Sequence, residues 1–153
     1  MKEIAIGSDH AGFRLKNRIV DRLKYMGYEV KDFGCYSEES VDYPDHIHPV
    51  AQYITDENEI GTFGIIICGS GNGAAMTANK HSGIRCALCW NDEITRLARE
   101  HNNANIISIP SRFVDDELAF ELIDIFLNTE FEGGRHERRI NKININSNES
   151  RTI

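Results

Sequence analysis

Apolar runs and amphipathic segments alternate along this chain of 153 residues, and no other feature restricts its fold as much. Each apolar run has the length of a buried strand, and each amphipathic segment repeats its apolar residues at helical spacing. The predicted strands cover residues 2–8, 28–34, 63–69, 83–90 and 104–110. The predicted helices cover residues 12–27, 43–56, a segment from about 72, 91–102 and 115–129. This order predicts an α/β fold in which a five-stranded parallel sheet lies between two layers of helices.

One domain accounts for the length and composition of the chain. With 41% hydrophobic residues, the sequence can build one full core. We expect the domain to span residues 1–143, including a C-terminal helix. Residues 144–153 are polar, rich in Asn and without periodicity, so we expect this tail to fray.

Charge and hydropathy exclude several classes of partner. The net charge of −7 argues against nucleic acid or an anionic membrane as the main partner, because both attract a basic surface. No run approaches the roughly 18 apolar residues of a membrane-spanning helix. The apolar run after Met1 is also too short for a signal peptide. We therefore expect a cytoplasmic protein.

The four cysteines are predicted to be free thiols, because a chain with this apolar content does not need disulfides. Cys86 and Cys89 match a C-x-x-C motif, but they lie inside a predicted strand. Side chains three positions apart in a strand point to opposite faces of the sheet. The motif is therefore not expected to form a metal or redox pair.

Polar and glycine-rich segments follow two predicted strands at their carboxyl ends, where parallel α/β sheets bind ligands. Asp9 and His10 follow the first strand, and the glycine-rich loop 69–73 follows the third. The backbone amides of this loop suit an anion, either a phosphate or an oxyanion formed during a reaction. A tight turn without a ligand is one alternative. The other is a dinucleotide-binding fingerprint, in which Asp92 would contact a ribose.

Cys68 directly precedes the glycine-rich loop. The loop amides and the following helix N-terminus favour a thiolate, which can act as a base or as a nucleophile. The alternative is a small buried side chain without a chemical role. Asp9 and His101 have similar alternatives without a chemical role. Asp9 would then serve simply as the cap of the first helix, and His101 would simply interact with the dipole of the fourth helix.

A basic segment near the C-terminus places Arg135 and Arg139 one helical turn apart. Two guanidinium groups at this spacing suit a phosphate, although a basic run can also be a solvated helix face. No cluster of metal ligands is evident from the sequence.

Seven motifs occur in order along residues 1–143: "GSDHAG", "DYPD", "CGSGNG", "NKHSGIR", "HNNAN", "SRF" and "EGGRHERR". Together they resemble the ribose-5-phosphate isomerase B family, within a wider group that includes the galactose-6-phosphate isomerase subunits. The resemblance implies a Rossmann-like, three-layer α/β/α sandwich. It also implies a homodimer or a dimer of dimers with active sites between subunits, and neither a cofactor nor a metal.

The resemblance also implies roles for individual residues. Cys68 would be the base that moves a proton between C1 and C2, His101 the acid that opens the furanose ring, and Asp9 a helper at the ring oxygen. Ser70 would hold the enediolate together with the loop amides. The implied substrate-binding residues are His10, Tyr43, Gly69, Gly71, Asn72, Gly73, Asn102, Arg112, Arg135 and Arg139.

The sequence departs from one branch of the family, in which a glutamate just after the glycine loop replaces the cysteine. Ala74 occupies that place here, so Cys68 has no visible substitute.

From the resemblance we predict an isomerase of the pentose phosphate pathway that interconverts ribose 5-phosphate and ribulose 5-phosphate through a cis-enediolate. The near alternative is an isomerase of a six-carbon sugar phosphate, such as allose 6-phosphate or galactose 6-phosphate. An alternative of another class is a nucleotide-binding module without catalysis.

Overall fold

The computed structural model describes residues 2–57 and 61–145. The strands are β1 (Glu3–Ser8), β2 (Glu29–Asp32), β3 (Phe63–Cys68), β4 (Cys86–Leu88) and β5 (Ile106–Pro110). The helices are α1 (Phe13–Tyr25), α2 (Tyr43–Glu57), α3 (Asn72–Ala78), α4 (Asp92–Glu100), α5 (Asp116–Asn128) and α6 (Arg135–Ile140). A short 3-10 turn, η1 (His10–Gly12), precedes α1.

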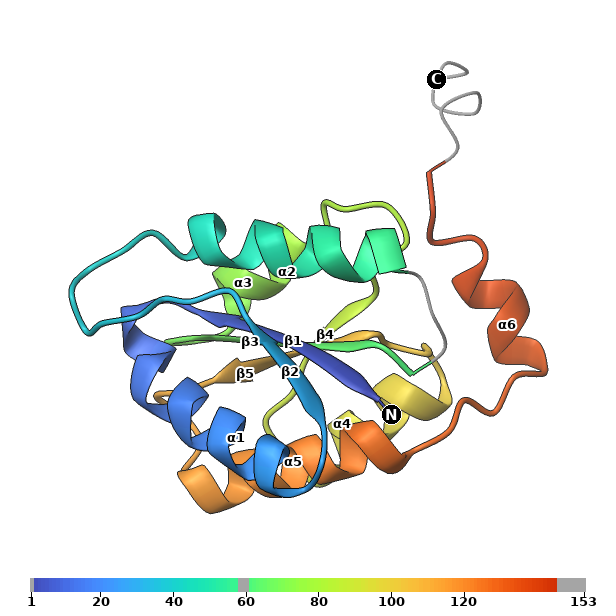
Figure 1. Ribbon diagram of the computed structural model, residues 1–153. Helices are drawn as coiled ribbons and strands as arrows, with labels where there is room; N and C mark the ends of the chain where they lie inside the picture. Colours follow the sequence, from blue (N-terminus) through green and yellow to red (C-terminus); the bar gives the residue numbers. More distant parts are fainter. Residues whose placement is uncertain (1, 58–60, 146–153) are drawn as a thin grey trace.

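All strand pairs are parallel, and the strand order is β2-β1-β3-β5-β4. Helices α1, α4 and α5 cover one face of the sheet, and α2 and α3 cover the other (Figure 1). The predicted α/β/α sandwich with a five-stranded parallel sheet is therefore confirmed. Among the described residues, no helix is long and apolar enough to cross a bilayer.

The central strand β3 shows why the core has two halves. Every residue of β3 is buried, and its successive side chains alternate between the two faces of the sheet. Ile65 and Ile67 pack with α1 and α5, whereas Ile66 and Cys68 pack with α2 and α3. The isoleucine run at 65–67 thus serves both halves of the core, which fixes β3 in the centre.

The edge strand β4 is shorter than the predicted strand 83–90. The Asn79 side chain pairs with the backbone of Cys86, accepting from its N–H at 2.8 Å and donating to its carbonyl at 3.0 Å. The Asn79 side chain thus occupies the backbone N–H and carbonyl of Cys86, to which another strand would have to hydrogen-bond in order to extend the sheet beyond β4. Cys86 and Cys89 pack in different halves of the core, as expected for their spacing.

Helix α6 stands apart from the two helical layers (Figure 1). The chain reaches it through Gly133 and Gly134, whose φ angles of 70° and 56° lie in the left-handed region that favours glycine.

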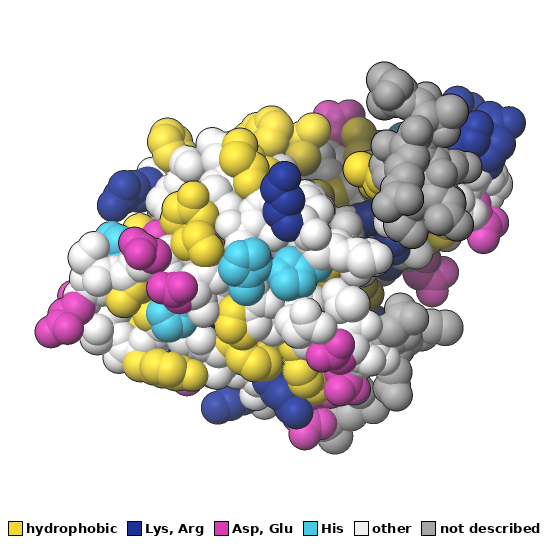
Figure 2. All heavy atoms as spheres, turned by 90° about the horizontal axis from the view of Figure 1, so that it is seen from above, with side chains coloured by type: hydrophobic (Ala, Val, Ile, Leu, Met, Phe, Trp, Pro, Cys, Tyr) yellow, Lys and Arg dark blue, Asp and Glu magenta, His cyan; other side chains and the backbone are white. Residues whose placement is uncertain are grey.

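The helical layer formed by α2 and α3 exposes apolar side chains to solvent (Figure 2), including Met76, which is 67% exposed. The predicted domain end at residue 143 stays a prediction, because most of the tail 144–153 lies outside the described residues.

Candidate active site

A pocket opens beyond the carboxyl ends of β1 and β3. These two strands are neighbours at the point where the strand order changes direction, which is where open α/β sheets bind ligands. The pocket has a volume of about 460 Å³. Its lining residues are Asp9, Tyr43, Cys68, Gly69, Ser70, Gly73, Arg112 and Phe113. Six of the predicted site residues at this edge therefore meet in one cavity with Cys68.

Cys68 is 4% exposed and ends β3 at the wall of the pocket. Its backbone carbonyl accepts a hydrogen bond from the N–H of Ser111 at 3.0 Å and from the Ser111 hydroxyl at 3.2 Å. The same hydroxyl lies 3.0 Å from the carbonyl oxygen of Ala11. Ser111 thus ties together the loops that follow β1, β3 and β5. The sequence analysis did not single it out, although its position directly after β5 was a signal.

Asp9 follows β1, and its carboxylate has one engaged oxygen and one available oxygen. Oδ1 accepts from the N–H groups of Ala11 and Gly12 at 3.0 and 3.2 Å, so the capping role is present. Neither of these bonds uses Oδ2. Since Asp9 also lines the pocket, capping and a chemical role are compatible.

The imidazole of His10 is held in place by the backbone of Val41. The Val41 N–H lies 3.1 Å from Nδ1 of His10, and the Val41 carbonyl oxygen lies 3.2 Å from the same nitrogen. A neutral ring with its hydrogen on Nε2 accepts the first of these bonds at Nδ1. In that tautomer His10 can donate from Nε2 to an anion.

The glycine-rich loop has its shape because two of its glycines leave no space for a side chain. Gly71 has φ of 76°, and a Cβ there would lie 2.4 Å from Cδ1 of Leu88. A Cβ at Gly73 would lie 2.5 Å from the ring of Tyr43, so Tyr43 packs directly on the start of α3. Helix α3 has only 7 residues, so an anion at this place would depend on the backbone amides of the loop rather than on a long helix.

Ser70 and Arg112 add polar groups to the pocket. The Ser70 hydroxyl oxygen accepts from the backbone and side-chain amides of Asn72 at 3.4 and 3.3 Å, which leaves its hydrogen free to donate. A Cβ at Gly69 would lie 3.1 Å from Nη1 of Arg112, so this guanidinium lies against the loop. Within residues 2–57 and 61–145, Arg112 forms no ion pair. Its charge is therefore available to a phosphate.

Four predicted site residues lie elsewhere. His101 and Asn102 follow α4 and precede β5, which places them at the amino-terminal edge of the parallel sheet, and Arg135 and Arg139 lie on α6. Cys68 pairs with Pro110 at the end of β5, whereas Gly64 pairs with Ile106 at its start. This length of strand alone separates the two edges by about 13 Å. One chain therefore cannot bring Cys68 and His101 to the same small substrate.

Two arginines that the sequence analysis did not identify hold the loop of His101 and Asn102. Arg85 donates to the carbonyl oxygens of Asn102 and Asn103 at distances of 3.0 to 3.2 Å. Arg99 is 7% exposed and donates to the side chain of Asn103 at 3.0 Å and to the Ala104 carbonyl at 2.6 Å. Burial lowers the pKa of both guanidinium groups. This loop is thus built into the core rather than exposed as a free surface turn.

The structure also brings together His101, Glu132 and His136, a group of possible metal ligands that the sequence analysis missed. Their ligand atoms all lie within 4.8 Å of one another. However, the two imidazole rings are stacked, with centroids 4.1 Å apart and planes at 13°. An imidazole nitrogen binds a metal in the plane of its ring, so two nearly parallel rings do not converge on one ion. The arrangement fits ring stacking better than metal binding.

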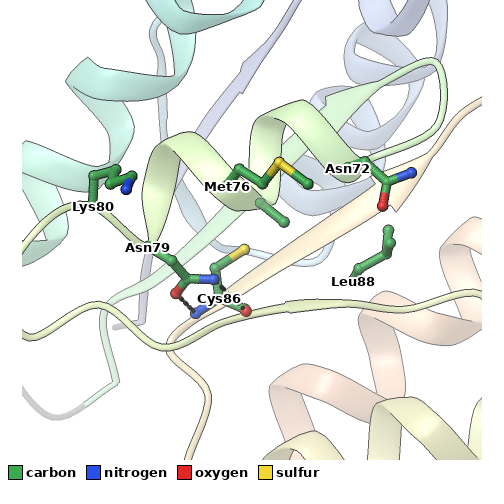
Figure 3. A pocket seen from close by; sticks show the side chains of 7 residues that line it. Asn72, Met76, Asn79, Lys80, Cys86 and Leu88 are labelled. Atoms are coloured by element: carbon green, nitrogen blue, oxygen red, sulfur yellow. Dashed lines mark hydrogen bonds between the residues drawn. The ribbon is translucent and has the colours of Figure 1, made fainter. Parts of the chain in front are cut away.

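A groove between α3 and β4 connects the two groups of site residues. Figure 3 shows its middle part, of about 480 Å³, with Met76 on one wall and Cys86 and Leu88 on the other. Towards the carboxyl edge of the sheet, Asn72 and Leu88 also line a hollow that includes Ser70. Towards the amino edge, Asn79 and Cys86 line a further hollow that includes Asn102. The apolar groove therefore extends from one group of site residues to the other.

Comparison with known proteins gives consistent results along nearly the whole chain. The model of the family described as Ribose/Galactose Isomerase matches residues 4–143. Ribose-5-phosphate isomerase B of Escherichia coli strain K12 is 43% identical over 143 residues, which cover 94% of this chain and 95% of the relative. The structure of a ribose 5-phosphate isomerase from Thermotoga maritima superposes with a TM-score of 0.89 at 53% identity, covering 93% of this chain and 97% of that one. Ribose-5-phosphate isomerase B from Mycoplasma genitalium, solved with bound ribulose-5-phosphate, gives a TM-score of 0.88 at 43% identity, covering 92% and 93%.

Proposed function

Because the chain belongs to the ribose/galactose isomerase family, we propose that it is an aldose-ketose isomerase that interconverts ribose 5-phosphate and ribulose 5-phosphate. The observation that carries this proposal is the convergence of a thiol, a carboxylate, a glycine-rich loop and an arginine in one pocket. These groups match the needs of the reaction, which are a base for a carbon-bound proton, a donor set for an oxyanion and a cation for a phosphate.

The isomerisation begins with opening of the furanose ring. His101 donates a proton to the ring oxygen as the bond between that oxygen and C1 breaks, and Asp9 assists with its available oxygen. The C1 hydroxyl releases its proton to water as the carbonyl forms. The Cys68 thiolate then removes the C2 proton of the aldose, and negative charge develops on the oxygen at C1. The amides of loop 69–73 and the Ser70 hydroxyl stabilise this enediolate. After a proton moves between the two oxygens, the Cys68 thiol returns its proton to C1 and the ketose is formed.

Phosphate binding falls to the cationic and donor groups around this pocket. His10 donates from Nε2, and Arg112 adds a guanidinium beside Gly69 that forms no ion pair with the described part of the chain. Arg135 and Arg139 of a second copy of the chain, both exposed on α6, supply two further guanidinium groups. Tyr43 and Asn102 bind sugar hydroxyls. A phosphorylated sugar carries charge that does not cross a bilayer unaided, so we place the reaction in the cytoplasm.

A second copy of the chain completes the site. In a two-fold dimer, the contact surface on one copy meets the same surface on the other, so opposite ends of that surface come together. The α3–β4 groove lies between the two groups of site residues, and a two-fold axis through it brings His101 and Asn102 of one copy to the Cys68 pocket of the other. Met76, 67% exposed on this surface, would be covered in the dimer. The active site is thus shared between subunits.

The function is tested by measuring isomerisation of ribose 5-phosphate and of allose 6-phosphate by the purified protein in the presence of EDTA. We expect turnover of the five-carbon substrate. Preference for the six-carbon substrate would identify the near alternative instead. Tight binding of a dinucleotide by a protein that isomerises neither sugar would overturn the proposal. In Cys68→Ala, kcat should fall by about a hundred- to ten-thousand-fold, because Ala74 offers no second base.

The shared site has a separate test. Met76→Glu places a charge in the proposed contact and should yield monomers in analytical ultracentrifugation, with loss of isomerase activity. Lys24→Glu is the control, because its exposed side chain lies on α1, which covers the opposite face of the sheet. A monomer that keeps full activity would exclude a site shared between copies.

A further inference from the structure

His136 is a buried histidine that none of the roles above uses. It lies in the first turn of α6 and is 7% exposed, although its neighbours Arg135 and Glu137 are exposed. Its ring stacks on that of His101 with centroids 4.1 Å apart and planes at 13°. A buried polar ring that lies flat on a residue with a proposed catalytic role calls for an explanation beyond packing.

The backbone holds both rings in one frame. The N–H of Glu132 donates to the carbonyl of Glu100 at 3.1 Å, which ties the segment before α6 to the end of α4. The N–H of His136 donates to the carbonyl of Gly133 at 3.1 Å, which closes the turn that delivers the ring. His101 directly follows Glu100. The stack is therefore fixed at both ends by main-chain hydrogen bonds close to the two rings.

The electrostatic surroundings favour a neutral His136. Burial lowers the pKa of His136, and the neighbouring His101, Arg135 and Arg139 lower it further. The Glu132 carboxylate, 3.6 Å from Nε2, opposes this effect only in part. A neutral ring presents a π face to His101 rather than a second positive charge, so a protonated His101 is not repelled.

We propose that His136 is a positioning residue that fixes the plane of the His101 ring, so that the proton of His101 points at the ring oxygen of the substrate in the partner's pocket. This inference rests on the function proposed above. It predicts that a flat ring at position 136 is required for ring opening, and that neither charge nor hydrogen bonding at this position is needed for substrate binding.

The test compares His136→Phe, which keeps a flat ring, with His136→Leu, which keeps apolar volume but has no flat face. In His136→Leu, kcat on ribose 5-phosphate should fall by about tenfold or more, since misplacement of a reacting group has effects of that size. Inhibition by a linear phosphorylated hydroxamate, which mimics the opened enediolate, should change little. His136→Phe should recover most of the lost kcat. The matched control is Arg138→Ala, an exposed residue of the same helix, which should change neither quantity.

A double-mutant cycle separates positioning from general packing. If His136 acts through His101, His101→Ala combined with His136→Leu should be no slower than His101→Ala alone. Multiplied losses, or loss of the hydroxamate in His136→Leu, would overturn the proposal. So would equal kcat values for the Phe and Leu variants.

One readout does not depend on turnover, so failure of this proposal can be distinguished from failure of the proposed function. In a crystal structure of the His136→Leu dimer, the His101 ring should leave the orientation that it has in the wild-type protein. A His101 ring that keeps its wild-type orientation without His136 would show that the stack positions nothing. If the wild-type protein does not isomerise ribose 5-phosphate, the proposed function fails whatever this structure shows.

Discussion

Cys68 and His101 lie at opposite edges of one parallel sheet. Cys68 ends β3 and pairs with Pro110 at the end of β5, whereas His101 precedes the start of β5. Two residues proposed to move protons on one sugar are therefore separated by the length of a strand within a chain. The proposed shared site therefore takes His101 from a second copy of the chain.

This separation predicts complementation between inactive variants. Cys68→Ala and His101→Ala should each have little activity alone. After subunit exchange in an equal mixture, each mixed dimer has one site with both wild-type residues, so about a quarter of all sites should recover. Isomerase activity before and after mixing is the measurement. A mixture of Cys68→Ala with Cys68→Ser is the control and should stay inactive. Failure to recover activity in dimers shown by mass spectrometry to be mixed would count against a shared site.

Thiol labelling should single out Cys68. Burial raises the pKa of the Cys86 thiol well above its ordinary value and raises that of Cys89 to about 11, so both should be protonated and slow to react at pH 7.5. Cys68 instead lines the open pocket beside the loop amides. Peptide mass spectrometry after brief iodoacetamide treatment should find the label on Cys68, in parallel with loss of activity, and ribose 5-phosphate should slow both. Inactivation accompanied by label on Cys86 or Cys89 alone would contradict this expectation.

Arg99 should be a major source of stability. Its guanidinium donates to the Ala104 carbonyl, to Asn103 and to the Thr129 carbonyl at 3.1 Å, while it packs over Phe63. Arg99→Met keeps the packing but leaves buried carbonyl groups without partners, and each such group costs about 1–3 kcal/mol. The free energy of unfolding, measured by urea denaturation, should fall by about 2–4 kcal/mol. Arg96→Met, an exposed position of the same helix, should change it by less than about 0.5 kcal/mol.

Stability should fall in mild acid, and His81 should contribute to that fall. Burial and the neighbouring His48, with Nδ1 2.7 Å from Nε2 of His81, lower the pKa of His81 in the folded state. The unfolded chain then binds more protons than the folded chain below about pH 6.5, so stability is present at neutral pH and is lost as the pH decreases. The melting temperature should drop less between pH 7.5 and pH 5.5 in His81→Gln than in the wild type. Equal drops in the two proteins would show that His81 does not contribute.

The local pattern of the sequence was sufficient to predict the fold. A strand such as residues 63–69 is apolar on both faces, so both faces of its sheet must be covered. Because amphipathic helices alternate with the strands along the chain, a parallel sheet between two helical layers meets this need. It also placed Asp9 and the loop 69–73 at the carboxyl edge, because the end of a strand is a local property. Asn91 and Asp115, the first residues of two predicted helices, each cap a helix by accepting a backbone hydrogen bond.

Tertiary structure alone decided how distant residues meet. The sequence motifs that resemble one family include both Cys68 and His101, but their order along the chain does not show which other side chains each of them contacts. The stacking of His136 on His101 and the anchoring of the loop by Arg85 and Arg99 join segments whose relative positions depend on how the helices pack. Short-range patterns fix which residues form strands and helices, whereas long-range packing determines which side chains share a site.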